Sequence, residues 1–229
     1  MDVVVGLGET GRPLFNVLKA TYPDTFGYDL KEVIGEWDGE PVGVMNICLP
    51  YFDNFVEIVK EYQAKFRPVI TIIHSTVPIG TTAQIPHAVH SPILGKHDNM
   101  EHSIRSFTKW IGGNTPHIVS GYFNVTGMNT RCVYSSETTE ALKLFCLAEY
   151  GMSIAFAQYK KDVCDKYGID YENVLVWAEN YNDHVSPDLR RPLITPPNGK
   201  IGGHCVVQNT RHLNKQHPNP ILDEILKYA

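Results

Sequence analysis

Several features are absent from this chain of 229 residues, and each absence narrows what the protein can be. No apolar run approaches the roughly 18–20 residues that span a bilayer, and Asp2 stands where a secretory signal peptide carries basic residues. There is no basic block, and Asp and Glu (25) outnumber Lys and Arg (20), which leaves no electrostatic footprint for nucleic acid. We therefore expect a cytoplasmic protein that binds neither membranes nor nucleic acid.

The cysteines also show no spacing typical of a disulfide framework. The five cysteines form no CxxC pair, and their odd number and wide spacing argue against disulfides and for a reducing compartment. We expect the four cysteines in apolar sequence to be small buried hydrophobes. These four are Cys48, Cys132, Cys146 and Cys164. The fifth, Cys205, lies in a polar, glycine-rich segment.

A histidine-rich stretch shows no metal-binding pattern. It holds His87, His90, His97 and His102. Neither an HExxH nor an HxxxH helix pattern is present, and a metal site needs a defined set of convergent ligands. We interpret these residues as surface or loop histidines and expect no metal site.

The residues that are present can build a core, with 43% hydrophobic and 20% charged. In the first half, short β-rich runs alternate with helical spacing of apolar residues, which predicts a parallel α/β sheet. Strands are expected at 3–5, 26–30, 42–49 and 69–73, with further short strands near 88–94, 108–112, 117–120 and 131–135. Helices are expected at 11–19 and 55–66.

The second half is predicted to be helical. One long helix is expected over 137–167, ending at Gly168, with Ser136 and Glu140 resembling a capping box at its start, and a second helix is expected over 171–180. We place the domain boundary near residue 133, which gives domains 1–133 and 134–229. The long helix is apolar over more than one face. This apolar surface is wider than the stripe that packing against one neighbouring domain requires, so we expect a homodimer formed along this helix.

A glycine pattern near the N-terminus predicts a dinucleotide site. Gly6, Gly8 and Gly11 form GxGxxG after an apolar strand and open a helix. The first glycine permits the tight turn, the second lets the backbone approach a pyrophosphate, and the third allows close packing of helix and strand. Asp29 lies 23 residues after Gly6 and would bind the ribose hydroxyls. An acid there favours NAD over NADP, although Lys31 is close enough to weaken that preference.

Five motifs then follow one another in a recognisable order. They are VVVGLGETG at 3–11, STVPIGT at 75–81, EALK at 140–143, GID at 168–170 and GKIGGHC at 199–205. In this order they resemble the UDP-glucose/GDP-mannose dehydrogenase family, including its UDP-N-acetylmannosamine dehydrogenases. The chain resembles about the first two thirds of a usual member. The resemblance implies a Rossmann-type NAD domain, a long central helix and a small helical domain.

The resemblance also implies a chemistry and a set of site residues. Members oxidise a sugar primary alcohol to the carboxylate in two NAD-dependent steps, through a thiohemiacetal on a cysteine. Cys205 matches that nucleophile, Lys143 the lysine that stabilises oxyanion charge, and Thr76 the threonine that orders a water. The expected cofactor contacts are Gly6, Gly8, Glu9, Thr10, Gly11, Asp29, Pro50, Ser75 and Thr76. The substrate would be a small molecule, such as a nucleotide sugar.

The sequence departs from the family pattern at several positions. Asn209 stands where the family has an Asp, Ile93 where it has a Glu, and Leu147 where it has an Asn. A second acid of the Ile93 loop aligns with His97. Loss of these carboxylates removes the obvious general base for thioester hydrolysis. Only 24 residues follow Cys205 (229 − 205), so we expect the family's C-terminal nucleotide-sugar-binding domain to be missing.

Three functions remain open from the sequence. The first is an NAD-dependent dehydrogenase of a sugar-like alcohol or aldehyde, acting through Cys205 and Lys143. The second is a dinucleotide-binding sensor or assembly protein that has lost catalysis, as the replaced acids would suggest. The third is a one-step hydroxyacid-type dehydrogenase that uses Lys143 without needing Cys205.

Overall fold

A computed structural model describes residues 1–95, 97–197, 199–202 and 205–229. The chain divides into two compact units, Met1–Lys143 and Leu144–Ala229. The first unit is an α/β domain and the second is helical, which confirms the expected fold class. The expected boundary near residue 133 stays a prediction. Among the described residues, no helix has the length and apolar character needed to cross a membrane.

The first unit is built on an eight-stranded sheet. Its strands are β1 (Val3–Val5), β2 (Phe26–Tyr28), β3 (Val33–Ile34), β4 (Val44–Ile47), β5 (Ile70–Ile73), β6 (Ala88–His90), β7 (Lys109–Gly112) and β8 (Thr130–Val133). They lie in the order β3-β2-β1-β4-β5-β6-β7-β8. Neighbouring strands are parallel except at β2–β3 and β6–β7, so the sheet is mixed rather than wholly parallel as expected. The carboxyl ends of β1, β2, β4 and β5 therefore share one edge.

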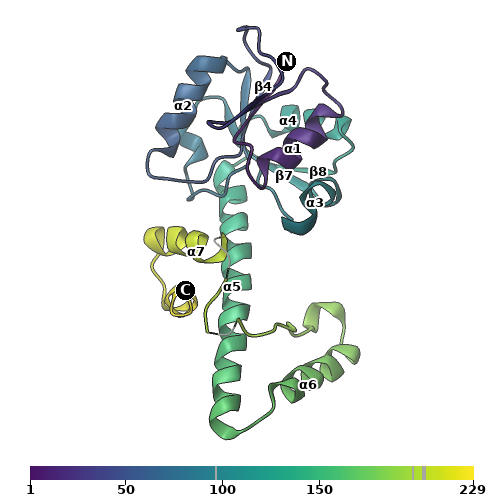
Figure 1. The fold of residues 1–229 in the computed structure, drawn as a ribbon, viewed down its shortest axis with the longest axis vertical. Helices are drawn as coiled ribbons and strands as arrows, with labels where there is room; N and C mark the ends of the chain where they lie inside the picture. The colour runs from purple at the N-terminus through teal and green to yellow at the C-terminus, as the bar shows by residue number, and fades with distance from the viewer. Residues whose placement is uncertain (96, 198, 203–204) are drawn as a thin grey trace. The chain divides into compact units, whose positions relative to one another are not determined.

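Helices cover both faces of this sheet (Figure 1). The helices of the unit are α1 (Gly11–Lys19), α2 (Phe55–Phe66), α3 (Met100–Ser106) and α4 (Pro116–Val125), with short 3-10 turns at Thr82–Gln84 and His97–Asn99. One buried apolar cluster joins α1, α3 and α4 to the sheet, and a second joins α2 to the other face. The strands between them are buried on both faces, as the continuous apolar runs predicted.

One predicted strand is wrong. Residues 117–120 belong to helix α4. Pro116 occupies the first turn, where a proline is already set for helical φ, and Val119 and Phe123 lie four apart on the buried side. The run from 117 to 120 is β-branched in part but too short to reveal this spacing by itself.

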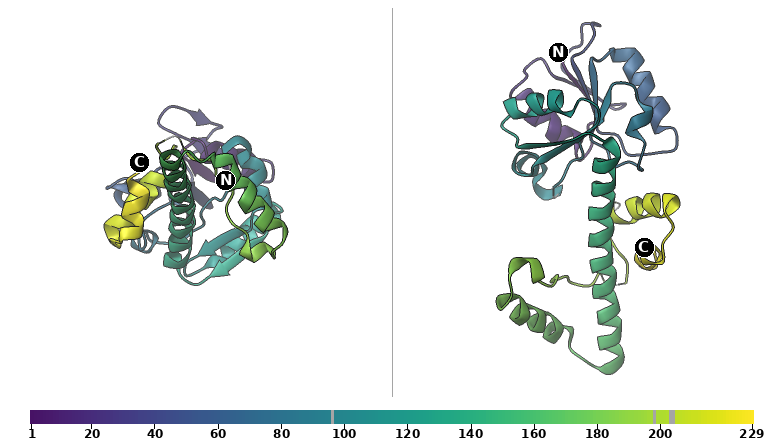
Figure 2. Two further views of the ribbon diagram at one scale, coloured as in Figure 1. Left: turned by 90° about the horizontal axis from the view of Figure 1, so that it is seen from below. Right: turned by 180° about the vertical axis from the view of Figure 1, so that it is seen from behind.

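The second unit consists of helices. Helix α5 (Ser136–Tyr167) begins in the first unit and continues into the second, where α6 (Tyr171–Asp183), the 3-10 turn Pro187–Leu189, α7 (Cys205–Gln216) and α8 (Pro220–Leu226) follow. Helices α7 and α8 lie on one side of α5 and α6 on the other (Figure 2). Gly151 permits the close approach, because an added Cβ would lie 2.7 Å from Val206 and 3.0 Å from Ile225.

The start of α5 differs from the expected capping box. The Ser135 hydroxyl, not that of Ser136, accepts the Thr138 N–H at 3.3 Å. The Glu140 carboxylate does not complete a capping box at the helix start. Its carboxylate accepts N–H groups from Gly80 and Thr82 instead, about sixty residues earlier in the chain.

Two expectations about burial are also corrected. His90 is completely buried in β6 rather than lying on the surface or in a loop, whereas His87 and His102 are exposed. Cys146 is exposed on α5, so it is not a buried hydrophobe, whereas Cys48 and Cys164 are buried as expected. The placement of a polar residue in a strand core depends on partners that lie far away in the sequence.

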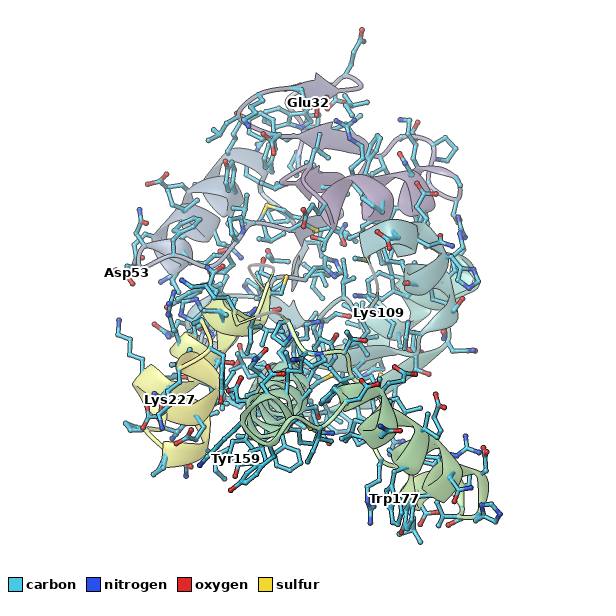
Figure 3. All side chains as sticks on the ribbon, turned by 60° about the horizontal axis from the view of Figure 1, so that its bottom comes forward. Glu32, Asp53, Lys109, Tyr159, Trp177 and Lys227 are labelled. Atoms are coloured by element: carbon cyan, nitrogen blue, oxygen red, sulfur yellow. The ribbon has the colours of Figure 1, made fainter. Side chains whose placement is uncertain are left out.

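Lys109, labelled in Figure 3, is a buried lysine that no local sequence pattern predicts. Its ammonium group donates to the carbonyls of Ser91 (2.7 Å) and Pro92 (3.2 Å) and lies 3.1 Å from His74 Nδ1. Burial lowers the pKa of Lys109 to about 7. Burial, reinforced by the charge of Lys109, also holds the pKa of His74 well below its usual value.

These contacts predict a pH dependence of stability. Between about pH 7 and 10.5 the unfolded chain keeps a proton on Lys109 that the folded protein has lost, so folding releases a proton and becomes more favourable as pH rises. Each pKa unit corresponds to about 1.4 kcal/mol. We expect the free energy of unfolding of the parent, relative to Lys109→Met, to rise by a few kcal/mol across this window. Urea titrations at a series of pH values measure it, and parallel curves for the two proteins would contradict the assignment.

Candidate functional site

The glycine turn after β1 is packed on its inner side and open on its outer side. Gly6 has a φ of +89°, and an added Cβ would lie 2.9 Å from the Cys48 carbonyl oxygen. At Gly11 an added Cβ would lie 1.8 Å from the Gly6 carbonyl oxygen, so only glycine fits between α1 and the turn. At Gly8 nothing lies within 4 Å of that position. The turn therefore leaves its backbone open to a ligand at the start of α1, where the helix dipole favours phosphate.

Asp29 follows β2 at the same edge of the sheet. Its Oδ2 accepts the N–H of Leu7, within the glycine turn, at 2.9 Å, and its Oδ1 accepts the N–H of Lys31 at 3.1 Å. These backbone hydrogen bonds lower the pKa of the Asp29 carboxyl. Each carboxylate oxygen has further acceptor capacity, so an ionised Asp29 fits the two hydroxyls of a ribose.

The basic residues near Asp29 are arranged in a way that bears on NAD against NADP. The guanidinium of Arg12, at the start of α1, forms a salt bridge with Glu32. Lys31 is exposed. Glu32 therefore already neutralises the Arg12 guanidinium at the start of α1.

Residues after β4 and β5 complete this edge. Pro50 is exposed three residues beyond the end of β4, and Ser75 and Thr76 follow β5 by two and three residues. Ser75 is buried, and among the described residues its hydroxyl has no hydrogen-bond partner. Its carbonyl lies 3.0 Å from Nε2 of the buried His90. An unsatisfied buried hydroxyl is costly, so the Ser75 side chain is suited to a ligand that supplies the missing partner.

Lys143 lies beside the loop that follows β6. Its ammonium group donates to the Ile93 carbonyl at 2.9 Å, and its side chain is half-buried. The Ile93 side chain packs in the apolar core, so this position presents no polar side-chain group. Lys109 holds the two preceding carbonyls of the same loop. Lysine ammonium groups therefore bind three successive carbonyls of this loop.

Cys205 and Asn209 belong to the second unit. Cys205 is half-buried and is the first residue of α7, where the positive end of the helix dipole favours a thiolate. Asn209 is buried one turn later, and its amide group donates to the Cys205 carbonyl at 2.8 Å. Gly203, His204 and the side chain of His97 lie outside the described residues. That Cys205 meets Lys143 at a substrate stays a prediction.

The structure thus brings one group of the predicted residues together within the first unit. The glycine turn, Asp29, Pro50, Ser75 and Thr76 all follow strands whose carboxyl ends share an edge, which is where ligands bind in open α/β sheets. Sequence reasoning missed the buried polar residues behind them. Glu140 was read as a helix cap, and Lys109 and His74 gave no signal, because nothing in a local pattern marks a buried charge.

Comparisons with known proteins agree with this fold. No protein-family model and no curated protein matches the sequence. Among solved structures, the chain is similar to a UDP-D-ManNAc dehydrogenase from Pyrococcus horikoshii, with TM-score 0.85 and 17% identity over 100% of this chain and 68% of that one. It is also similar to a UDP-glucose dehydrogenase from Pyrobaculum islandicum, with TM-score 0.77 and 14% identity over 99% of this chain and 67% of that one.

A third similar structure is an NDP-N-acetyl-D-galactosaminuronic acid dehydrogenase from Methanosarcina mazei Go1, with TM-score 0.73 and 16% identity over 99% of this chain and 65% of that one. The chain therefore spans about two thirds of the length of these proteins. The resemblance stated from the motifs is confirmed as a likeness of fold. At these identities the likeness establishes the fold alone.

Proposed function

We propose that this protein is an NAD-dependent oxidoreductase that oxidises a sugar-like alcohol or aldehyde. The observation that supports it most is the shared sheet edge, where an open glycine turn and Asp29 lie on the same side as the unsatisfied Ser75 hydroxyl. The first two features suit the phosphates and ribose of a dinucleotide. The likeness of this fold to three nucleotide-sugar dehydrogenases supports the same proposal.

The residues of this edge fit NAD. The glycine turn would hold the pyrophosphate, Asp29 the ribose, and Pro50, Ser75 and Thr76 would line the path toward the nicotinamide, with Glu9 and Thr10 beside the phosphates. When bound, NAD supplies the hydride acceptor for the oxidation.

A nucleotide preference follows from the charges at Asp29. We expect NADH to bind more tightly than NADPH by about tenfold or more, because repulsion of roughly 1.4 kcal/mol already gives that ratio. Asp29→Asn should narrow the gap chiefly by improving NADPH binding. Isothermal titration calorimetry with both nucleotides measures this. Equal or tighter NADPH binding by the parent protein would overturn the assignment.

Cys205 and Lys143 would act on the substrate carbon. An aldehyde is a poor hydride donor, but addition of the Cys205 thiolate gives a thiohemiacetal whose carbon can release hydride. The Lys143 ammonium group would stabilise the negative charge that develops on the substrate oxygen. Loss of hydride leaves a thioester on Cys205, and water must cleave it to release the acid. Thr76 would order that water.

The experiment that tests the proposal is a substrate survey with NAD. NADH formation is followed with UDP-linked sugars, simple sugar alcohols and sugar aldehydes as separate arms. Turnover with one of these classes, lost in Asp29→Ala through a raised KM for NAD, supports the proposal. A parent protein that binds NADH but reduces no NAD with any arm would favour a binding protein without catalysis.

We also propose a homodimer formed along α5. The helix exposes Phe145, Tyr150, Phe156 and Tyr159, each more than half exposed, and Phe156 stacks on Tyr159 at 6.1 Å. Figure 3 shows Tyr159 and the 80%-exposed Trp177 at the outer surface. An exposed pair of stacked aromatic side chains such as Phe156 and Tyr159 is typical of an interaction surface.

The dimer is open to a direct measurement. Light scattering at micromolar concentration should give twice the monomer mass of 25.8 kDa, and Phe156→Lys should shift the protein toward the monomer by placing a charge in the interface. A particle of 25.8 kDa for the parent would remove the dimer. A cytoplasmic location, which would keep the Cys205 thiol reduced, stays a prediction.

A further inference from the structure

The first turns of α5 hold three separate segments near the candidate site, all within the first unit. The Thr139 hydroxyl lies 2.8 Å from His90 Nδ1, and His90 bonds through its other ring nitrogen to the Ser75 carbonyl. Burial lowers the pKa of His90 to about 3, so this ring is neutral at physiological pH. Lys143, one turn after Thr139, holds the Ile93 carbonyl. Between them lies Glu140.

Glu140 is a completely buried carboxyl group with two backbone partners. Its Oε2 accepts the Gly80 N–H at 2.6 Å, and its Oε1 accepts the Thr82 N–H at 2.8 Å. Gly80 has a φ of +86° and lies in a turn that the Thr81 N–H closes on the Pro78 carbonyl at 3.2 Å. This turn continues directly from Ser75 and Thr76. Glu140 therefore fixes the far end of the segment that begins at the expected nicotinamide contacts.

Burying this carboxyl group is unfavourable unless its hydrogen bonds compensate. Burial raises the pKa of Glu140, whereas the hydrogen bonds from Thr82 and Gly80 oppose that rise. A residue that only filled this space could be apolar. A charged carboxylate can instead accept a hydrogen bond from both N–H groups at once, one on each oxygen. It therefore fixes the position of the turn and does not only fill the space beside it.

We propose that Glu140 is a positioning residue that holds Thr76 and Lys143 at fixed positions relative to each other. It binds the turn that follows Thr76 and stands three residues before Lys143, on the same face of α5. The inference rests on the proposed function, in which Thr76 orders the water and Lys143 stabilises the oxyanion. A displacement of about 1 Å between such groups can lower a rate about 10²-fold.

The experiment compares Glu140→Gln with Glu140→Asp and with Glu137→Gln. A glutamine can accept from one N–H but presents an NH₂ group to the other, so one of the two hydrogen bonds is lost. Aspartate keeps the charge on a shorter side chain. Glu137 is exposed in the turn before, where its carboxylate accepts from the Ser135 hydroxyl at 2.7 Å, so Glu137→Gln is a matched control on the same helix.

Two readouts separate positioning from simple stabilisation. The first is kcat per NADH-binding site, with the sites titrated in each variant, so that loss of folded protein does not count as loss of activity. We expect Glu140→Gln to lower kcat per site about 10²-fold without changing the KM for NAD, Glu140→Asp to recover part of it, and Glu137→Gln to match the parent. The second is amide hydrogen exchange, which in Glu140→Gln should rise about tenfold or more at whichever of Gly80 and Thr82 loses its acceptor, and should not change in Glu137→Gln.

The outcomes distinguish this inference from the proposed function. A Glu140→Gln protein that melts at lower temperature but keeps kcat per site would show a structural role only and overturn the inference. If the parent oxidises no substrate, the proposed function fails. The hydrogen exchange then tests the inference about Glu140 by itself, and unchanged exchange at both Gly80 and Thr82 in Glu140→Gln would overturn it as well. Faster exchange in Glu140→Gln that is absent from Glu137→Gln supports the positioning of this turn by Glu140 on its own.

Discussion

Replacing Lys143 by methionine should lower kcat about 10²- to 10³-fold, the usual loss when one donor to an oxyanion is removed. Methionine keeps the length of the side chain and removes the charge. The ammonium group is held at the Ile93 carbonyl, so in the parent little reorganisation is needed as charge develops on the substrate oxygen. Binding of NADH should be unchanged, because the predicted nucleotide contacts lie on other segments. Steady-state kinetics and NADH titration on the same preparations measure both.

A second lysine of α5 provides the matched control. Lys166 is exposed near the end of the helix, so Lys166→Met removes a charge of the same kind without touching the loop after β6. We expect its kcat to equal that of the parent. If Lys143→Met also keeps the parent kcat while remaining folded, Lys143 does not stabilise the transition state and the proposed role is wrong.

Oxidation should stop before a free acid is released. Hydrolysis of a thioester requires an activated water, and general-base help contributes about 10²–10⁴ in rate. The Ile93 side chain is packed in the apolar core, and the buried Asn209 amide is bound to the Cys205 carbonyl. Neither can take a proton from water. We therefore expect no released acid. An alcohol substrate should give one NADH if an aldehyde is released, or two NADH in a single turnover per active site if the acyl group stays on Cys205.

Counting the NADH formed per substrate consumed can also contradict this prediction. A ratio of two NADH per substrate, reached with rapid turnover by the isolated protein, would show that another group supplies the base. Asn209→Asp is the informative variant. It introduces a carboxylate one turn from Cys205 but removes the amide that donates to the Cys205 carbonyl. We expect faster release of acid from any stalled acyl-enzyme, together with a loss of stability of about 1 kcal/mol from the missing hydrogen bond.

Local patterns predicted much of the fold. Helices α1 and α2 have the bounds that the spacing of their apolar residues indicated, and strand β1 and the glycine turn are where the motif placed them. In these segments each residue's environment follows from neighbours three or four positions away, or from alternation between the faces of a strand. Helix α4 was misread because its four-residue window fits either structure.

The parts that sequence could not predict depend on distant partners. Glu140 finds its hydrogen bonds 58 and 60 residues away, and Lys109 finds its partners 17 to 35 residues away. A buried charge is stable only where such partners converge, and no local pattern reports that convergence. Cys205 and Asn209 were identified by motif alone. The hydrogen bond between them shows that Asn209 is part of the local structure around the thiol.

The role of Cys205 as the nucleophile can be measured by covalent capture of the substrate. The protein is incubated with NAD and the aldehyde that gives the fastest NADH formation in the substrate survey, then quenched in acid, digested and analysed by mass spectrometry, in parallel with Cys205→Ala. We expect an acyl adduct on the peptide that contains Cys205, formed with one equivalent of NADH, and loss of aldehyde oxidation in the variant. Unmodified Cys205 in the parent, with NADH formed at an equal rate by Cys205→Ala, would contradict it.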